Sequence, residues 1–174
     1  MLGFFARYKY LRHSYGFGVH SPSAYRMVRE VLCPTSRYGY YSRDIIRKSA
    51  SSRRQFREDY LLYRLLVDMH PSSVYIAAPD GCDSIRRIVR MALPSAAIDK
   101  TPFGAECIVQ KGPDVSCTLY SAATPRQMIL LDCNDKVFNV LTRSMKSGHV
   151  FRSPRRALFI NDPRLPLEIF TLFF

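Results

Sequence analysis

The spacing of hydrophobic residues along the chain alternates between helical periodicity and short continuous runs. Apolar residues that recur every three or four positions predict amphipathic helices, and these fall at residues 4–13, 22–33, 53–69, 83–93 and 134–147. Short apolar runs bounded by turn residues are typical of buried strands, and these fall at residues 74–78, 96–98, 107–109, 117–120, 127–132 and 157–160. The alternation of strands with helices predicts an α/β fold, Rossmann-like, with a mainly parallel sheet and helices on both faces.

Turn and capping residues set the predicted ends of these elements. Ser21 is expected to cap the helix that starts at Pro22, and Pro34 to end it. Gly148 is expected to cap the carboxyl end of the helix at 134–147. The polar segment 34–52 predicts a surface loop with at most one helical turn, at 44–48.

The chain has 174 residues, of which 47% are hydrophobic and 23% charged. This composition excludes a disordered tail, a collagen-like rod and a coiled coil. We expect one structural domain, with residues 1–70 as an N-terminal helical extension and 71–174 as the α/β core.

The cysteines and the apolar runs bear on the cellular compartment. The five cysteines form no C-x-x-C pair and are odd in number, which argues against a zinc ribbon or a closed disulfide framework. No apolar run is long enough to span a membrane. We therefore expect reduced thiols in a cytoplasmic protein that has no membrane partner.

Charge is concentrated in the first third of the chain. Residues 1–64 carry a net charge of +9 out of the total of +12, together with nine of the eleven tyrosines. Arginines for phosphates and aromatic rings for unstacked bases are typical of RNA-binding surfaces. The alternative is that the tyrosines pack into the core while the arginines stay solvated, and no RRM or KH motif is present. The densest basic patch consists of Arg43, Arg47, Lys48, Arg53, Arg54 and Arg57.

Three segments carry a resemblance to a known family. Leu11–Ser14 and Gly18–Pro22 precede a helix, the helix at 60–69 leads into Val74, and Ile129–Asp132 and Leu158–Asp162 are apolar runs that end in acids. Together they resemble a bacterial group of class I S-adenosylmethionine-dependent methyltransferases that has an N-terminal H-S-P-F segment. In this chain Ser23 stands in place of the phenylalanine of that segment. The resemblance implies that 129–132 and 158–160 are the family's fourth and fifth strands.

The resemblance implies S-adenosylmethionine as cofactor, bound at the first turn between strand and helix. The residues in or near that site are Ala78, Asp80, Gly81, Asp99 and Asp132. The turn departs from the family pattern, because Ile76 stands at the place of the acid and Cys82 at that of a later glycine. The chain is also short for the family, so we expect its final β-hairpin to be missing.

Three functional hypotheses follow, and the sequence leaves open whether the protein is an enzyme. The first is a catalytically silent methyltransferase-like protein, with Tyr75, Ile76 and Cys82 filling the cofactor cleft. The second is an active methyltransferase with an unusual loop that uses Asp99, Asp132 and Asp162. The third is an RNA- or phosphate-binding module on the basic first third.

Two further features have simpler explanations beside the functional ones. Asp132 and Asp162 are the pair that could hold a metal ion, although acids at strand ends also cap helices and turns without one. His13 and His20 lie near serines without an acid to complete a triad, and no catalytic residue is assigned. The apolar end at 165–174 is expected to be covered by the core, by a second copy or by a protein partner.

Overall fold

The computed structural model describes residues 11–12, 14–16, 18–34, 41–78, 82–112, 127–132 and 135–174. Within them, the helices are α2 (Pro22–Arg26), the π-helix η1 (Met27–Leu32), α3 (Tyr41–Ser49), α4 (Arg53–Met69), α5 (Cys82–Ala92) and α6 (Asp135–Ser144). The strands are β1 (Ser73–Ala77), β2 (Ala97–Asp99), β3 (Cys107–Gln110), β4 (Met128–Asp132), β5 (His149–Arg152), β6 (Arg156–Ile160) and β7 (Glu168–Thr171). The predicted segments 4–10 and 117–120 lie outside the described residues.

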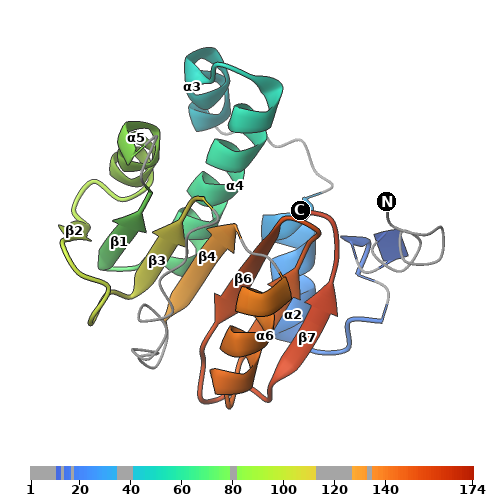
Figure 1. Cartoon of the computed structure of the whole chain (residues 1–174). Coiled ribbons are helices and arrows are strands. Elements are labelled where there is room, and N and C mark those ends of the chain that lie inside the picture. Colours follow the sequence, from blue (N-terminus) through green and yellow to red (C-terminus); the bar gives the residue numbers. More distant parts are fainter. Residues whose placement is uncertain are drawn as a thin grey trace.

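The strands form one seven-stranded sheet in the order β2-β1-β3-β4-β6-β5-β7 (Figure 1). The pairs β2–β1, β1–β3, β3–β4 and β5–β7 are parallel. Strand β6 runs antiparallel to both of its neighbours, β4 and β5. The prediction of an α/β fold with a mostly parallel sheet is therefore confirmed.

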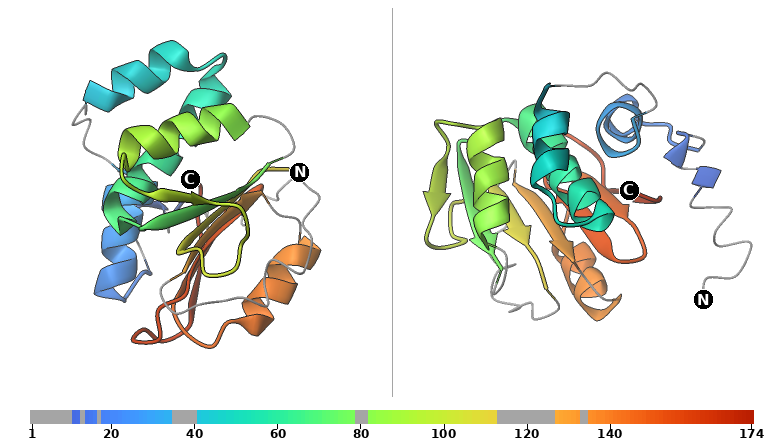
Figure 2. Two further views of the ribbon diagram at one scale, coloured as in Figure 1. Left: turned by 90° about the vertical axis from the view of Figure 1, so that its left-hand side faces the viewer. Right: turned by 90° about the horizontal axis from the view of Figure 1, so that it is seen from above.

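Helices cover both faces of the sheet, as expected (Figure 2). Helices α2, η1, α4 and α5 pack with the larger hydrophobic core on one face, which includes Val74, Met128 and Phe151. Helix α6 packs on the other face through Val137, Phe138 and Leu141. The helices that precede residue 70 thus share one core with the sheet.

Helix α4 has the bounds that the sequence predicts, because its pattern and its caps agree. The Ser52 hydroxyl accepts a hydrogen bond from the backbone N–H of Gln55 at 3.1 Å, which satisfies one unpaired donor of the first turn. Leucines at 61, 62, 65 and 66 are buried, and burial of each contributes about 1.5–3 kcal/mol. The helix ends at His70, whose left-handed φ of 48° turns the chain toward β1. Because α4 leads into the start of β1, its amino end lies at the carboxyl edge of the parallel strands.

The carboxyl-terminal third differs from the prediction in strand direction. The run at 157–160 is expected to be a parallel strand, but it forms the antiparallel strand β6 of a hairpin with β5. Strand β5 is not among the predicted elements, and it forms an antiparallel hairpin with β6 at this end of the sheet. The physical reason is the three-residue link between Arg152 and Arg156, which is long enough for a hairpin but far too short for a parallel crossover.

Two helix predictions also need correction. The segment around 44–48 is a nine-residue helix, α3, whose Ile46 is buried in the main core. Helix α6 ends at Ser144, so Gly148 is not its cap. Gly148 instead has φ of 101° at the start of β5, where a Cβ atom would lie 2.0 Å from the carbonyl oxygen of Ile160. Only glycine fits this close approach.

The apolar end of the chain is covered from within. Strand β7 pairs with β5, and Phe170 and Leu172 are buried in the main core. The backbone N–H of Phe173 donates to the Ser14 hydroxyl at 2.9 Å. These residues therefore need no second copy or partner to cover them, although Ile169 is 49% exposed. Among the described helices, none is both long and apolar enough to cross a membrane.

Candidate functional site

The topology gathers distant parts of the chain at the carboxyl edge of the sheet. Strands β3 and β4 end there at Gln110 and Asp132, and the amino end of α4 lies over them. Because β6 runs antiparallel to β4, it begins at this edge, with Arg156 directly opposite Asp132. Because β5 and β7 run parallel to β4, the 153–155 turn and the chain end at 172–174 also reach it. Ligands of open α/β folds bind at this edge.

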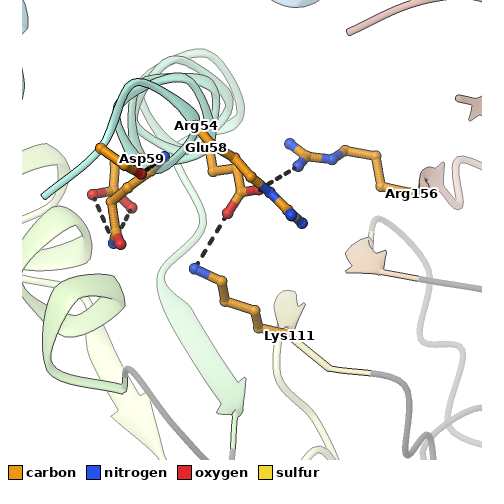
Figure 3. A network of polar contacts seen from close by, with 7 residues as sticks. Arg54, Glu58, Asp59, Lys111 and Arg156 are labelled. Carbon is orange, nitrogen blue, oxygen red and sulfur yellow. Dashed lines mark hydrogen bonds and ion pairs between the residues drawn. The ribbon is translucent and has the colours of Figure 1, made fainter. Parts of the chain in front are cut away.

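Glu58 of α4 lies at the centre of a cluster of cations. Its carboxylate contacts Arg54 Nε at 2.9 Å, Arg156 Nη2 at 3.1 Å and Lys111 Nζ at 3.3 Å. Figure 3 shows Glu58 between Lys111, at the end of β3, and Arg156, at the start of β6. The side chains of Glu58 and Arg156 are only 15% and 14% exposed, whereas that of Arg54 is 68% exposed. This ion cluster joins α4 to two strands of the sheet.

The two neighbouring acids of α4 have opposite pKa shifts. Burial alone would raise the pKa of Glu58, but the hydrogen bond from Arg54 and the charges of Arg156 and Lys111 outweigh it and lower the pKa. Burial raises the pKa of Asp59, and the hydrogen bond from the Gln55 amide, at 3.3 Å, offsets only part of that shift. Asp59 is 2% exposed, and no cation of the described segments is as close to it as those around Glu58.

The space left beneath the ion cluster is small. A cavity of about 40 Å³ is lined by Glu58, Asp59, Lys111, Asp132 and Arg156 together with apolar residues of α4, α5, β3 and β4. Such a volume holds a few water molecules, and ligand pockets are typically about 300–1,000 Å³. Of the predicted cofactor residues that the structure describes, only Asp132 lines this cavity.

The other predicted cofactor residues lie along neighbouring strands. Asp99 ends β2 and is the register partner of Tyr75 in β1, and Ala78 follows β1. The Ala78 carbonyl accepts a hydrogen bond from the Cys82 thiol at 2.7 Å. Asp80 and Gly81 lie outside the described residues. The described residues do not fit S-adenosylmethionine, because Ile76 packs into the main core where the resemblance expects an acid.

The expectation that Tyr75, Ile76 and Cys82 together fill the cleft is wrong. Consecutive residues of a strand face opposite sides of the sheet, so Tyr75 packs on the α6 side and Ile76 on the α4 side. The ends of β3 and β4 are covered by Glu58, Lys111 and Arg156, which none of the sequence hypotheses placed there.

Asp132 and Asp162, the pair predicted to hold a metal ion, lie far apart in the structure. Asp132 ends β4 at the carboxyl edge, whereas Asp162 follows the antiparallel strand β6 and lies at the opposite edge, next to the start of β4. Asp162 contacts the guanidinium of Arg164 at 2.6 Å and 2.9 Å. No group of three metal-ligating side chains occurs in the described part of the chain. The reversed direction of β6 also takes Asp162 away from the other acids of the active-methyltransferase hypothesis.

Beside the ion cluster lies a larger hollow surface, which we call the arginine groove. It consists of two hollows, of about 680 Å³ and 720 Å³, that share Arg53 and Arg57. Among the residues that the structure describes, seven arginines line it and Glu58 is the one acid. These arginines are Arg43, Arg47, Arg53, Arg54, Arg57, Arg155 and Arg156. The structure therefore brings together five of the six basic residues singled out in the sequence, while Lys48 is exposed on α3 outside the lining.

The second hollow also contains residues that the sequence analysis did not select. Arg155 and Arg156 enter from the hairpin turn, and Phe173 and Phe174 from the end of the chain. The sequence does contain an indication of the first pair, since Pro154 and two arginines separate two apolar runs. Recognition of that hairpin would have placed both arginines at the carboxyl edge.

The groove can bind anions, because guanidinium groups donate paired hydrogen bonds to phosphate or carboxylate oxygens. Aromatic rings occur at both ends, with Phe56 in one hollow and Phe173 and Phe174 in the other. Comparison of the chain with known proteins gives no match to a protein-family model, to a curated protein or to a solved structure.

Proposed function

We propose that the protein binds single-stranded RNA in the arginine groove. The observation that carries the proposal is the convergence of α3, α4 and the β5–β6 turn, which are far apart in sequence, on two adjoining hollows that the described residues line with seven arginines and one acid. A single inorganic phosphate would engage only one part of this surface. Two adjoining hollows suit a chain of phosphates, each of which a different arginine can contact.

The lining residues divide into two roles under this proposal. Arg43, Arg47, Arg53, Arg57 and Arg155 bind phosphate oxygens, whereas Arg54 and Arg156 pair with Glu58 and hold the wall of the groove. The half-buried rings of Phe173 and Phe174 offer aromatic surface on which a base can stack, irrespective of sequence. We therefore expect binding with little sequence preference and a strong dependence on salt.

The test is the affinity of the full chain for a fluorescent single-stranded RNA, measured by anisotropy at several salt concentrations. With four phosphate contacts, the slope of log affinity against log salt is expected to be about −3, so affinity falls about 50-fold between about 50 and 200 mM salt. The triple variant Arg53→Ala, Arg57→Ala, Arg155→Ala should bind at least about tenfold more weakly, with a shallower slope.

A matched control removes the same charge elsewhere. The variant Arg86→Ala, Arg87→Ala, Arg143→Ala changes three exposed arginines of α5 and α6 that do not line the groove. It should retain RNA affinity within about threefold. Equal losses in both triple variants would overturn the groove proposal in favour of attraction by net charge alone. Tighter binding of duplex RNA or of polyphosphate would overturn the choice of a single strand.

A second proposal concerns the origin of the scaffold. We propose that the domain is a Rossmann-like relative of class I methyltransferases that has lost its cofactor site and does not transfer methyl groups. The β5–β6 hairpin favours this proposal, because the resemblance implies a hairpin at this end of the sheet. The apolar Ile76 at the acid position and the ion cluster over the strand ends favour the loss of the cofactor.

The test of the second proposal is calorimetric titration with S-adenosylmethionine and S-adenosylhomocysteine. No detectable binding is expected for either ligand up to millimolar concentration. Binding tighter than about 100 μM, which corresponds to about −5.5 kcal/mol, would contradict the loss of the site. The RNA and cofactor tests are independent, since none of the described cofactor residues Ala78, Asp99 and Asp132 lines the arginine groove.

A further inference from the structure

At the amino edge of the sheet, opposite the arginine groove, three polar side chains from distant segments meet. Ser23 lies in the first turn of α2, His149 begins β5 and Glu168 begins β7. His149 and Glu168 are register partners in the parallel pair β5–β7. The Ser23 hydroxyl oxygen lies 2.8 Å from His149 Nε2, and His149 Nδ1 lies 3.4 Å from Glu168 Oε2. This hydroxyl–imidazole–carboxylate order is that of an activated serine.

Packing fixes the histidine and leaves the serine accessible. The His149 side chain is 3% exposed, and its ring meets those of Phe151 and Phe170 at centroid distances of 6.1 Å and 6.0 Å. Ser23 is exposed at the surface of α2. A reagent in solution can therefore reach the hydroxyl, while the imidazole behind it keeps one orientation.

The surroundings of His149 select the tautomer that acts as a base. Nδ1 and Glu168 Oε2 are both buried, have no hydrogen-bond partner among the described residues and lie 3.4 Å from each other. A carboxylate only accepts hydrogen bonds, and the stable arrangement therefore places the proton on Nδ1. The lone pair of Nε2 is then directed at the Ser23 hydroxyl.

The charge state of the ring is also suitable. Burial lowers the pKa of His149, and the carboxylates of Glu168 and Asp162 only partly oppose that shift. The imidazole is therefore neutral at pH 7 and able to accept a proton. The sequence analysis considered only His13 and His20 as partners of nearby serines, and neither has an acid to complete a triad. It could not pair Ser23 with His149, because 126 residues separate them.

We propose that Ser23 is a nucleophile, with His149 as its general base, that takes an acyl group from an activated ester or thioester. The Ser23 oxygen forms a bond to the acyl carbon, and the bond from that carbon to the leaving oxygen or sulfur breaks. The hydroxyl proton passes to His149 Nε2 and from there to the leaving group. The products are O-acyl-Ser23 and an alcohol or thiol, and no further reactant is consumed.

Ser21 provides a matched control within the same turn. Its hydroxyl oxygen lies 3.5 Å from the same Nε2 and 3.0 Å from the Ser23 oxygen. Ser21 is occupied as the cap of α2, where it accepts from the backbone N–H of Ala24. If the network served only to fix α2 to the sheet, loss of either serine would lower stability and neither would be acylated.

The test uses p-nitrophenyl acetate with the full chain. We expect a burst of p-nitrophenolate close to one per chain, and a single acetyl group that peptide mass spectrometry places on Ser23. Ser23→Ala should remove this burst, and Ser21→Ala should retain it within about threefold. Glu168→Gln should slow acetylation at least about tenfold, because the tautomer is no longer fixed. An acetyl group found only on lysines would overturn the proposal.

The pH profile decides the role of His149 even if His149→Gln does not fold. The rate of Ser23 acetylation should rise with pH and level off, with a midpoint below the ordinary histidine value of 6.5. The charged groups that face the ring are Glu168 and Asp162. A rate that keeps rising through pH 8 would show attack without His149 and would overturn its role as the base. A folded His149→Gln protein, checked by circular dichroism, that retains full acetylation would do the same.

Discussion

The ion cluster and the arginine groove are neighbouring regions at the carboxyl edge of the sheet, and α4 contributes to both. They differ in whether their cations are paired with an acid. In the cluster, Lys111, Arg156 and Arg54 all contact Glu58. In the groove, Arg43, Arg47, Arg53, Arg57 and Arg155 have no acidic partner within 4 Å among the described residues. Arg156, which lines both regions, belongs to the first by its contacts.

Exposure explains the difference for Arg156 and Lys111, whereas Arg54 pairs with Glu58 one turn along α4 although its side chain is 68% exposed. Arg156 and Lys111 have side chains that are 14% and 33% exposed, and a cation withdrawn from water requires a counter-charge. Arg47, Arg53 and Arg57 are exposed, so water solvates them without an acid. The paired cations are therefore structural, and the unpaired ones remain available to an anion from outside. Mutations at this edge should separate into two classes accordingly.

The largest expected effect is that of Glu58→Gln, which removes the acid common to three cations. We expect a loss of about 2–3 kcal/mol in the free energy of unfolding, because Arg156 and Lys111 are left partly buried without a counter-charge. The measurement is urea denaturation at pH 7. The control is Glu30→Gln, whose side chain is 66% exposed beside Arg26 and should change stability by less than about 0.5 kcal/mol. Equal effects would show that the cluster does not stabilise the fold.

The neighbouring arginines of the hairpin turn provide the sharpest contrast. Arg156→Ala should cost about 1–2 kcal/mol of stability, through loss of the contact with Glu58. Arg155→Ala should leave stability within about 0.5 kcal/mol. In RNA anisotropy the order should reverse, with Arg155→Ala weakening affinity about three- to tenfold, or about 0.6–1.4 kcal/mol. If both substitutions have the same effects in both assays, the division into paired and unpaired arginines is wrong.

The sequence predicts the side of the arginine groove that α3 and α4 form, but not the side that the β5–β6 turn forms. Helix α4 has its predicted bounds because its hydrophobic stripe, the Ser52 cap and Pro71 all agree. Five groove arginines follow from it and from the basic segment before it. The second side depends on the direction of β6, and hydrophobic runs do not encode strand direction. An apolar run at 157–160 fits a parallel or an antiparallel strand equally well.

The polar constellations show the same limit. Glu58 meets Lys111 and Arg156, and Ser23 meets His149, across separations of 53, 98 and 126 residues, which no local motif records. The sequence pairs Asp132 with Asp162 because both follow apolar runs, and the reversal of β6 moves them to opposite edges. Residue types at strand ends can be read from the sequence, but which ends are adjacent is decided by the sheet order.

The smallest expected effect is that of a substitution at Asp59, whose pKa shift is opposite in direction to that of Glu58. The folded-state pKa of Asp59 is raised, so the native protein binds a proton more readily than the unfolded chain does. This carboxyl group therefore lowers stability as pH rises from its unfolded pKa through its folded pKa. Glu58 has a lowered pKa, so its contribution is present above its unfolded pKa and is lost as pH falls through the folded value.

Asp59→Asn should accordingly stabilise the protein by about 0.5–1 kcal/mol at pH 7 and have no stabilising effect near pH 3. The carboxamide oxygen that this substitution introduces can still accept the hydrogen bond from Gln55, so the gain comes from removing a buried charge rather than from a new contact. The measurement is urea denaturation across pH 3–8 for the wild type and the variant.

Glu58→Gln serves as the opposite control, since its loss of stability should shrink as pH falls and Glu58 in the wild type is protonated. A destabilised Asp59→Asn protein at pH 7 would mean that Lys111 and Arg87, the cations whose charges reach Asp59, outweigh its burial. Asp59 would then belong to the ion cluster, and the boundary between the two regions would have to include it.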